Sequence, residues 1–237
     1  PMSMCGTDAW IPAQFVQQIA GGMAGTELFN KVCDGEEKWN NETHIKASEE
    51  VKKMADNGYF QVGYIGMGPE ESTDLFTSGQ AAMYFQGAWD ADKVSKSSIG
   101  ENAGAFVLPA YDEQYSNISV GSVDTSFSVS ENCKNKDAAV AFLKYWTSQE
   151  NEGMLLYENG RIPAGNYEID ESKLSPLMGD VLNISNTQRG LTPWWDRQFG
   201  AGEGVEFNNT CVSVLGGEDA KTAFDALQQF AEDNADR

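Results

Sequence analysis

The chain has 237 residues, of which 41% are apolar and 22% charged, and its 36 acidic and 16 basic residues give a formal net charge of −20. These proportions are typical of a globular protein with one large domain or two small lobes. The negative charge argues against nucleic acid or anionic lipid as a partner, because both bind through lysine and arginine.

No apolar run approaches the roughly 20 residues that span a bilayer, and no signal peptide is visible. No hydrophobic segment precedes Cys5, so we do not interpret it as a lipidation site. The chain's cysteines lack the C-x-x-C spacing of zinc or redox sites, so we expect isolated thiols, no metal and no cofactor, although the spacing leaves a disulfide open. They are Cys5, Cys33, Cys133 and Cys211.

The first elements follow from apolar spacing and helix-breaking residues. Met2 and Met4 indicate the end of a strand, and residues 7–10 a turn into a helix over 11–19 with Pro12 in its first turn. We expect Gly21 and Gly22 to end that helix.

Residues 29–44 are polar and acidic, which predicts a surface excursion that leaves His44 in solvent. A helix over 48–57 follows, and then a loop over 59–71. The glycines of that loop lack the G-x-G-x-x-G pattern and the P-loop lysine, which argues against phosphate binding.

Residues 75–94 are the most informative stretch. Leu75 and Phe76 end an amphipathic helix that Gly79 stops, residues 81–85 read as a buried strand, and a new helix begins near Asp90. Trp89 then follows the carboxyl end of a strand, where open α/β sheets bind ligands. The alternative is a core tryptophan, since large aromatic residues are mostly buried.

Further along the chain we expect short strands over 105–109 and 126–129, separated by a polar loop over 111–119. A helix over 137–146 has the spacing of an amphipathic helix, which predicts a buried Trp146. Ser148 can cap a helix over 149–157 that Asn159 and Gly160 end. More helices are predicted over 172–184, 206–215 and 219–233, and the second aromatic cluster lies at 192–197.

The order of these parts resembles a known family. The segments are Asn-Gly-Tyr-Phe at 57–60, Leu-Phe-Thr-Ser-Gly-Gln-Ala-Ala-Met at 75–83, Gly-Ala-Trp at 87–89, Phe-Val-Leu-Pro-Ala at 106–110, Gly-Ser at 121–122, the helix at 135–148 and Asn-Gly-Arg-Ile-Pro-Ala at 159–164. Together they resemble the extracellular solute-binding proteins of ABC sugar importers, the group that includes maltose-binding protein. The resemblance covers almost the whole chain.

The resemblance implies an α/β, type II periplasmic-binding-protein fold with two lobes that close on a ligand. On this basis residues 1–101 are the first part of the carboxyl lobe, residues 102–161 cross to the amino lobe, and residues 162–237 return to the carboxyl lobe. Family members have a further amino-terminal region of about a domain's length. We therefore expect this chain to be a truncated or proteolysed form that holds mostly the carboxyl lobe.

The same resemblance implies which residues contact a sugar, because tryptophan covers the apolar face of a sugar ring and polar groups bind its hydroxyls. Asp8 and Asp124 are the candidate acceptors, and Ser122 and the backbone of Gly121 the candidate donors. Arg197 could bind bidentately, or form a surface ion pair with Asp196 or Glu203. The aromatic candidates are Trp10, Trp89, Trp194 and Trp195, with at most one of the last two facing a cleft.

The resemblance thus implies a non-enzymatic protein that captures a carbohydrate outside the cytoplasmic membrane and delivers it to an ABC permease. We expect it to be a monomer. It would be periplasmic or a cell-surface lipoprotein in its full-length bacterial form. Two alternatives stay open: an acidic aromatic cleft could hold a polyamine or another small solute, and the many acids leave room for a carbohydrate hydrolase. A single histidine argues against a Ser-His-Asp hydrolase or a histidine-rich metal site.

Overall fold

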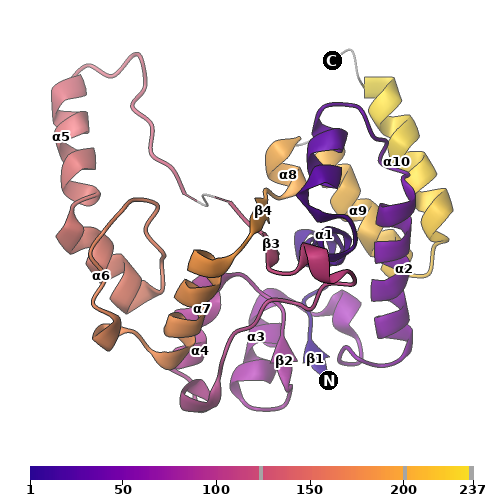
Figure 1. Cartoon of the computed structure of the whole chain (residues 1–237), viewed down its shortest axis with the longest axis horizontal. Helices are drawn as coiled ribbons and strands as arrows, with labels where there is room; N and C mark the ends of the chain where they lie inside the picture. The colour runs from indigo at the N-terminus through magenta and orange to yellow at the C-terminus, as the bar shows by residue number, and fades with distance from the viewer. Residues whose placement is uncertain (123–124, 200–201, 235–237) are drawn as a thin grey trace. The chain divides into compact units, whose positions relative to one another are not determined.

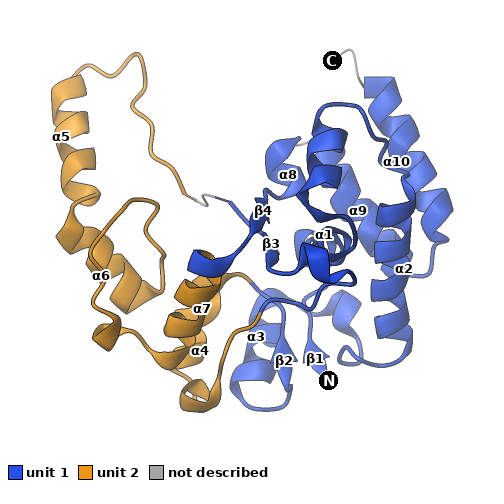
Figure 2. Ribbon diagram, viewed as in Figure 1, with its two compact units in different colours: residues 1–86, 107–122, 186–237 blue, residues 87–106, 123–185 orange. Residues whose placement is uncertain are grey.

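A computed structural model describes residues 1–122, 125–199 and 202–234. The chain divides into two compact units. Unit 1 comprises Pro1–Gln86, Val107–Ser122 and Asn186–Arg237, and unit 2 comprises Gly87–Phe106 and Val123–Ser185 (Figure 2). The expected assignment of residues 1–101, 102–161 and 162–237 to lobes of a longer protein stays a prediction.

Unit 1 is built mainly of helices (Figure 1). Their buried faces form a large hydrophobic core. α1 packs against α2 and α9, and α10 packs against the same two helices. Their bounds are α1 Trp10–Cys33, α2 Glu42–Asp56, α3 Pro69–Thr77, α8 Trp195–Gln198, α9 Glu203–Leu215 and α10 Ala220–Asn234. The side chains of Phe15, Phe207 and Phe224 are at most 1% exposed, and each such side chain stabilises the fold by about 1.5–3 kcal/mol.

Two parallel two-stranded sheets complete unit 1. β1 (Met2–Ser3) pairs with β2 (Met83–Tyr84), and β3 (Ile118–Val120) pairs with β4 (Gly190–Thr192). The predicted strand end at Met2 is confirmed, whereas the expected strand over 81–85 is reduced to two residues. The expected strands over 105–109 and 126–129 are wrong, since those residues lie outside regular structure, and the expected loop over 111–119 contains the start of β3.

α1 does not end at Gly21 and Gly22, so that expectation is wrong. A Cβ on Gly22 would lie 3.2 Å from Cα of Ala110, and the carbonyl of Gly22 accepts hydrogen bonds from the amides of Tyr111 and Asp112. The glycine therefore lets a neighbouring segment approach the helix closely. The helix axis changes at Gly25 instead, whose φ of 71° is outside the helical region.

Residues 29–44 are not a surface excursion, and this expectation is also wrong. Phe29, Trp39 and His44 are 9%, 3% and 1% exposed, and all lie in the aromatic centre of unit 1. The indole Nε1 of Trp39 donates to Oε2 of Glu203 at 2.6 Å. The polar residues of this segment thus surround a few buried rings.

Unit 2 contains α4 (Ala91–Ser95), α5 (Lys136–Trp146), α6 (Gln149–Asn159) and most of α7 (Pro176–Thr187). The predicted caps of α6 are confirmed, because Ser148 accepts from the amide of Asn151 and Gly160 takes a left-handed conformation with φ 67°. Gly79, with φ 74°, likewise follows the end of α3 as expected.

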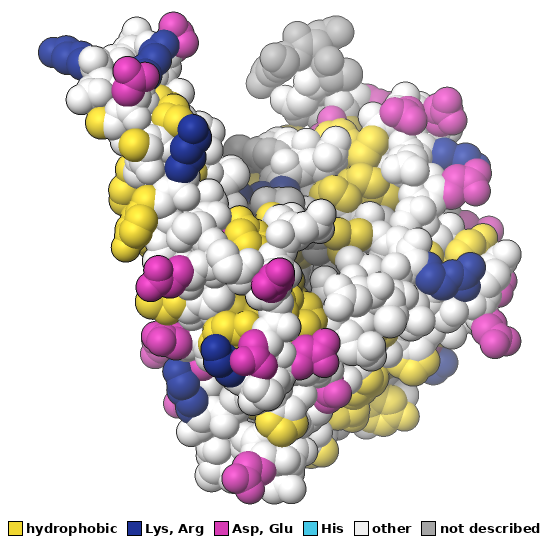
Figure 3. Space-filling model, turned by 60° about the vertical axis from the view of Figure 1, so that its left-hand side comes forward, with side chains coloured by type: hydrophobic (Ala, Val, Ile, Leu, Met, Phe, Trp, Pro, Cys, Tyr) yellow, Lys and Arg dark blue, Asp and Glu magenta, His cyan; other side chains and the backbone are white. Residues whose placement is uncertain are grey.

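The predicted amphipathic helix α5 exists, but its apolar face is not buried. None of its residues is buried, and Phe142 and Tyr145 are 54% and 67% exposed. Hydrophobic side chains are visible at several places on the surface of the molecule (Figure 3). Trp146, which was expected in the core, is only partly buried and contacts the rings of Phe127 and Phe142. None of the helices in the described ranges combines the length and the apolar composition of a membrane span.

Candidate functional site

Asp8 and Trp10 lie at the start of α1. The amide of Ile11 donates to the carbonyl of Asp8 at 2.9 Å, and Pro12 occupies the first turn, as predicted. Trp10 is partly buried and packs against the core of unit 1. Part of the residue therefore stays accessible at the point where the loop after β1 becomes a helix.

β3 and β4 are parallel, so both strands end at the same edge, and candidate residues follow each of them. Gly121 and Ser122 follow β3, while Pro193 and Trp194 follow β4. The amide of Gly121 donates to the carbonyl of Thr192 at 2.9 Å, which extends the ladder by one bond. This N–H is therefore not available to a ligand, which corrects the prediction of a backbone donor at Gly121.

The two adjacent tryptophans have different surroundings from those of Trp10. Trp195 is 2% exposed; its ring stacks on Phe29 with centroids 4.4 Å apart and meets Trp39 edge-on at 4.8 Å. A ring this deeply enclosed offers no face to a ligand, so Trp195 is a core residue rather than a contact residue. Trp194 keeps 9% of its surface and occupies the position before α8, where its carbonyl accepts from the amides of Arg197 and Gln198.

Arg197 is exposed. Asp196 and Glu203, the two acids of its alternative ion pair, bind other groups. Oδ2 of Asp196 accepts from Nδ2 of Asn208 at 3.0 Å, and Glu203 accepts from the indole of Trp39. Within residues 1–122, 125–199 and 202–234 no ion pair of Arg197 is found. Its guanidinium lies on the short helix that follows Trp194.

Trp89 belongs to unit 2. It lies in a 3₁₀ turn, Ala88–Asp90, directly before α4, and it is partly buried. Its indole folds back so closely over Gly87 that a Cβ there would overlap the ring. Only glycine fits at position 87, because any side chain there would overlap the ring. Asp92 pairs with Lys96 at 2.8 Å, as a solvated acid on a helix does.

The candidates are therefore divided between the units. Unit 1 brings Ser122 and Trp194 to one sheet edge and holds Asp8, Trp10 and Arg197, whereas Trp89 belongs to unit 2. Asp124 lies outside the described residues. In the described part of the chain, no group of three His, Cys, Asp or Glu side chains is placed to hold a metal ion, and all four cysteines are free.

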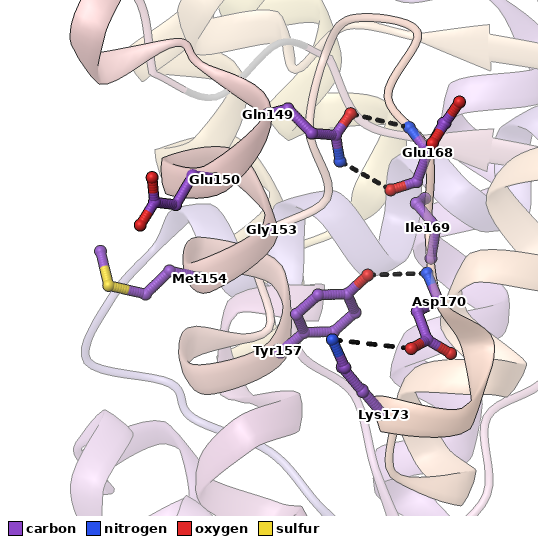
Figure 4. Close-up of a pocket in the computed structure, with 9 residues that line it drawn as sticks. All are labelled: Gln149, Glu150, Gly153, Met154, Tyr157, Glu168, Ile169, Asp170 and Lys173. Atoms are coloured by element: carbon purple, nitrogen blue, oxygen red, sulfur yellow. Dashed lines mark hydrogen bonds and ion pairs between the residues drawn. The ribbon is translucent and has the colours of Figure 1, made fainter.

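One groove of about 500 Å³ lies in unit 2 beside α6, and no predicted residue lines it (Figure 4). The side chain of Gln149 exchanges two hydrogen bonds with the backbone of Glu168, and the hydroxyl of Tyr157 accepts from the amide of Asp170 at 2.7 Å. Lys173 lies over the ring of Tyr157, with 5.5 Å from Nζ to the centroid. These groups bind one another and hold the segment against α6.

Sequence reasoning missed two glutamines of α1, Gln17 and Gln18, which are 5% and 9% exposed. Both donate to backbone carbonyls at the β3–β4 sheet, at 2.7 Å each. Two adjacent amides inside the apolar run 11–20 were the available signal, since buried polar groups need partners.

Comparison with known proteins agrees with the fold described above. A family model described as bacterial extracellular solute-binding protein matches residues 3–153. The galactooligosaccharide-binding protein of Bacillus subtilis (strain 168) is 28% identical over 156 residues, which are 63% of this chain and 36% of that protein.

Two solved structures resemble the chain over nearly its full length. A chitin oligosaccharide binding protein has a TM-score of 0.87 at 22% identity, covering 98% of this chain and 60% of the other. A protein from work on xylan utilization by the thermophilic bacterium Caldanaerobius polysaccharolyticus has a TM-score of 0.88 at 25% identity, covering 97% and 60%. The chain thus spans less than two thirds of each relative, and the expected type II periplasmic-binding-protein fold is confirmed.

Proposed function

This chain belongs to the bacterial extracellular solute-binding proteins, and we propose that the protein captures an oligosaccharide and delivers it to the permease of an ABC importer. The observation that carries the proposal is the agreement among its relatives. One is named for galactooligosaccharides, one for chitin oligosaccharides, and one comes from work on xylan utilization. The family is described as solute-binding, and two of these relatives are named as binding proteins, so we propose binding without turnover.

The chemistry of the proposed site is aromatic stacking combined with hydrogen bonds. Trp10 and Trp89 are partly buried, so each indole is held by the protein yet keeps surface for the apolar face of a sugar ring. Trp194 contributes the 9% of its surface that stays exposed. Asp8 and Asp124 accept from hydroxyls, and Ser122 and Arg197 donate to them.

The proposal includes the cellular setting. The protein works outside the cytoplasmic membrane, as a monomer, and meets its permease after it has bound sugar. The net charge of −20 keeps such a protein soluble and carries no information about an uncharged ligand.

The test is calorimetric titration of the full-length protein with galacto-, chito- and xylo-oligosaccharides, and with spermidine. We expect binding of at least one oligosaccharide, and we expect Trp89→Ala to weaken it more than about tenfold, or about 1.4 kcal/mol, because the stacking surface is lost.

Tyr145→Ala is the matched control. It also removes an aromatic ring from unit 2, but this ring is 67% exposed and lies outside the proposed contacts, so the affinity should not change. Binding of spermidine alone, or release of shortened sugars during incubation, would overturn the proposal in favour of a polyamine-binding protein or a hydrolase. Equal affinity of wild type and a folded Trp89→Ala variant would remove Trp89 from the site.

A further inference from the structure

Two adjacent glutamines in the middle of α1 are buried. Gln17 and Gln18 are 5% and 9% exposed, and they lie in the most apolar part of the longest helix of unit 1. A buried amide is costly unless it is hydrogen-bonded, and a helix interior has no free backbone groups to bind it. Both side chains instead bind backbone groups of the β3–β4 sheet.

Gln18 binds the edge of β3 as a neighbouring strand would. Its Nε2 donates to the carbonyl of Ile118 at 2.7 Å, and its Oε1 accepts from the amide of Val120 at 2.9 Å. These two groups flank Ser119 on one side of the strand, which is the pair that a residue of a parallel strand uses.

The opposite side of β3 is occupied by β4. There the amide of Arg189 donates to the carbonyl of Asn117 at 2.8 Å, and the amide of Gly121 donates to the carbonyl of Thr192 at 2.9 Å. Gln18 therefore binds the backbone groups on the side of β3 that β4 does not cover. It also fixes the position of β3 along α1.

Gln17 acts on the other strand. Its Nε2 donates to the carbonyl of Pro193 at 2.7 Å and lies 3.4 Å from Oγ1 of Thr192. The carbonyl of Pro193 belongs to the peptide plane that carries the backbone nitrogen of Trp194. Holding this plane fixes the direction in which the chain enters Trp194.

Together, one helix controls where both strands end. Val120 is two residues before Ser122, and Pro193 directly precedes Trp194, so each glutamine is next to one part of the proposed binding site. Ligand sites require side chains to be held within about 0.5 Å of the productive geometry by neighbours that are themselves fixed.

We infer that Gln17 and Gln18 are positioning residues of the ligand site, with Gln17 acting through Trp194 and Gln18 acting through Ser122. The inference rests on the proposed carbohydrate-binding function. Each glutamine should therefore affect one residue of the site. A general loss of stability would affect both residues alike.

The variants are Gln17→Met and Gln18→Met, which keep the length of the side chain and remove its hydrogen bonds. Gln14→Met is the control, since it makes the same change on the same helix at a partly buried position. We expect each of the first two to weaken oligosaccharide binding about tenfold and Gln14→Met to change it less than about twofold.

A crossed double-mutant design separates positioning from stability. The effect of Gln17→Met should vanish in a Trp194→Ala background and persist in a Ser122→Ala background, and Gln18→Met should show the reverse. A uniform loss of affinity in both backgrounds, in proportion to the loss of unfolding free energy, would overturn the inference.

A readout without ligand keeps the two proposals apart. In NMR spectra of the ligand-free protein, Gln17→Met should shift the indole N–H signal of Trp194 more than the amide signal of Ser122, and Gln18→Met should do the opposite. Absence of sugar binding by the wild type overturns the proposed function. Equal shifts at both positions in both variants overturn the positioning by itself.

Discussion

His44 is the only histidine of the chain, and its imidazole is enclosed by aromatic rings at the centre of unit 1. It stacks on Trp39 and Phe224, with centroids 5.9 Å away in each case, and Nδ1 lies 3.0 Å from the carbonyl oxygen of Trp39. Burial lowers the pKa of His44 to about 4, because the charged ring would lose its hydration. The expectation of a solvated His44 is therefore wrong.

This pKa makes the stability of the protein dependent on pH. The unfolded chain binds a proton at His44 near pH 6.5, and the folded chain binds it only near pH 4. The contribution of the neutral, buried His44 to the free energy of unfolding is therefore complete above about pH 6.5 and is lost as the pH falls toward 4. We expect the wild type to lose about 3 kcal/mol through this residue between pH 7 and pH 4. Denaturant unfolding at a series of pH values measures it.

His44→Gln is the control for that experiment, because the carboxylates of the chain titrate equally in both proteins and their effect cancels. The unfolding free energy of the wild type minus that of His44→Gln should fall by about 3 kcal/mol from about pH 7 to pH 4. Parallel curves would mean that His44 is hydrated in the folded protein.

The two adjacent tryptophans show how much of the site the sequence could predict at the scale of single residues. The sequence predicts the aromatic cluster itself, and it predicts that at most one of the two rings faces a ligand. Which ring is enclosed more deeply depends on Phe29 and Trp39, which are more than 150 residues away in the sequence and pack against Trp195. No local pattern contains that information.

At the scale of elements, the kink of α1 depends on one residue. Gly25 has φ 71° and ψ −164°, a region that residues with a side chain rarely adopt, and a Cβ there would lie 2.8 Å from the ring of Tyr115. We expect Gly25→Ala to destabilise the protein by about 3 kcal/mol, because it adds both backbone strain and a steric overlap.

Gly35→Ala measures the cost of a positive φ at a position without a close neighbour. Gly35 has the same φ of 71°, but no atom lies within 4 Å of the position of its Cβ. This variant should lose only about 1 kcal/mol, from backbone strain alone, by denaturant unfolding. Equal losses in the two variants would show that Tyr115 moves away and that α1 does not depend on this contact.

Helix ends were predictable because their signals are local, as Ser148, Gly160 and Gly79 show. The beginning of α2 was missed. A helix that starts at Ser48 excludes His44, whereas the observed start at Glu42 places His44, Ala47, Ser48 and Val51 on one buried face at helical spacing. β3 and β4 were missed because each has three residues and a partner about 70 positions away.

At the scale of the whole molecule, the two units differ in how much apolar surface they bury. The large buried rings belong to unit 1, including Phe15, Trp195, Phe207 and Phe224. The buried hydrophobic residues described in unit 2 are smaller and fewer: Ala91, Val94, Leu156, Leu177, Met178 and Leu182. An amphipathic helix can thus be predicted from spacing, although spacing does not show what covers it.

The stability of α5 follows from this difference. Its 11 residues include none that is buried, and Val140, Phe142 and Tyr145 are each more than 40% exposed. A helix this short is marginal in water without tertiary packing, so it should open without global unfolding. We expect its amides to exchange with solvent at least about a hundredfold faster than those of α9, whose Phe207 and Cys211 are at most 1% exposed, as measured by hydrogen–deuterium exchange. Equal protection of α5 and α9 would contradict this, and would mean that the apolar face of α5 is covered in solution.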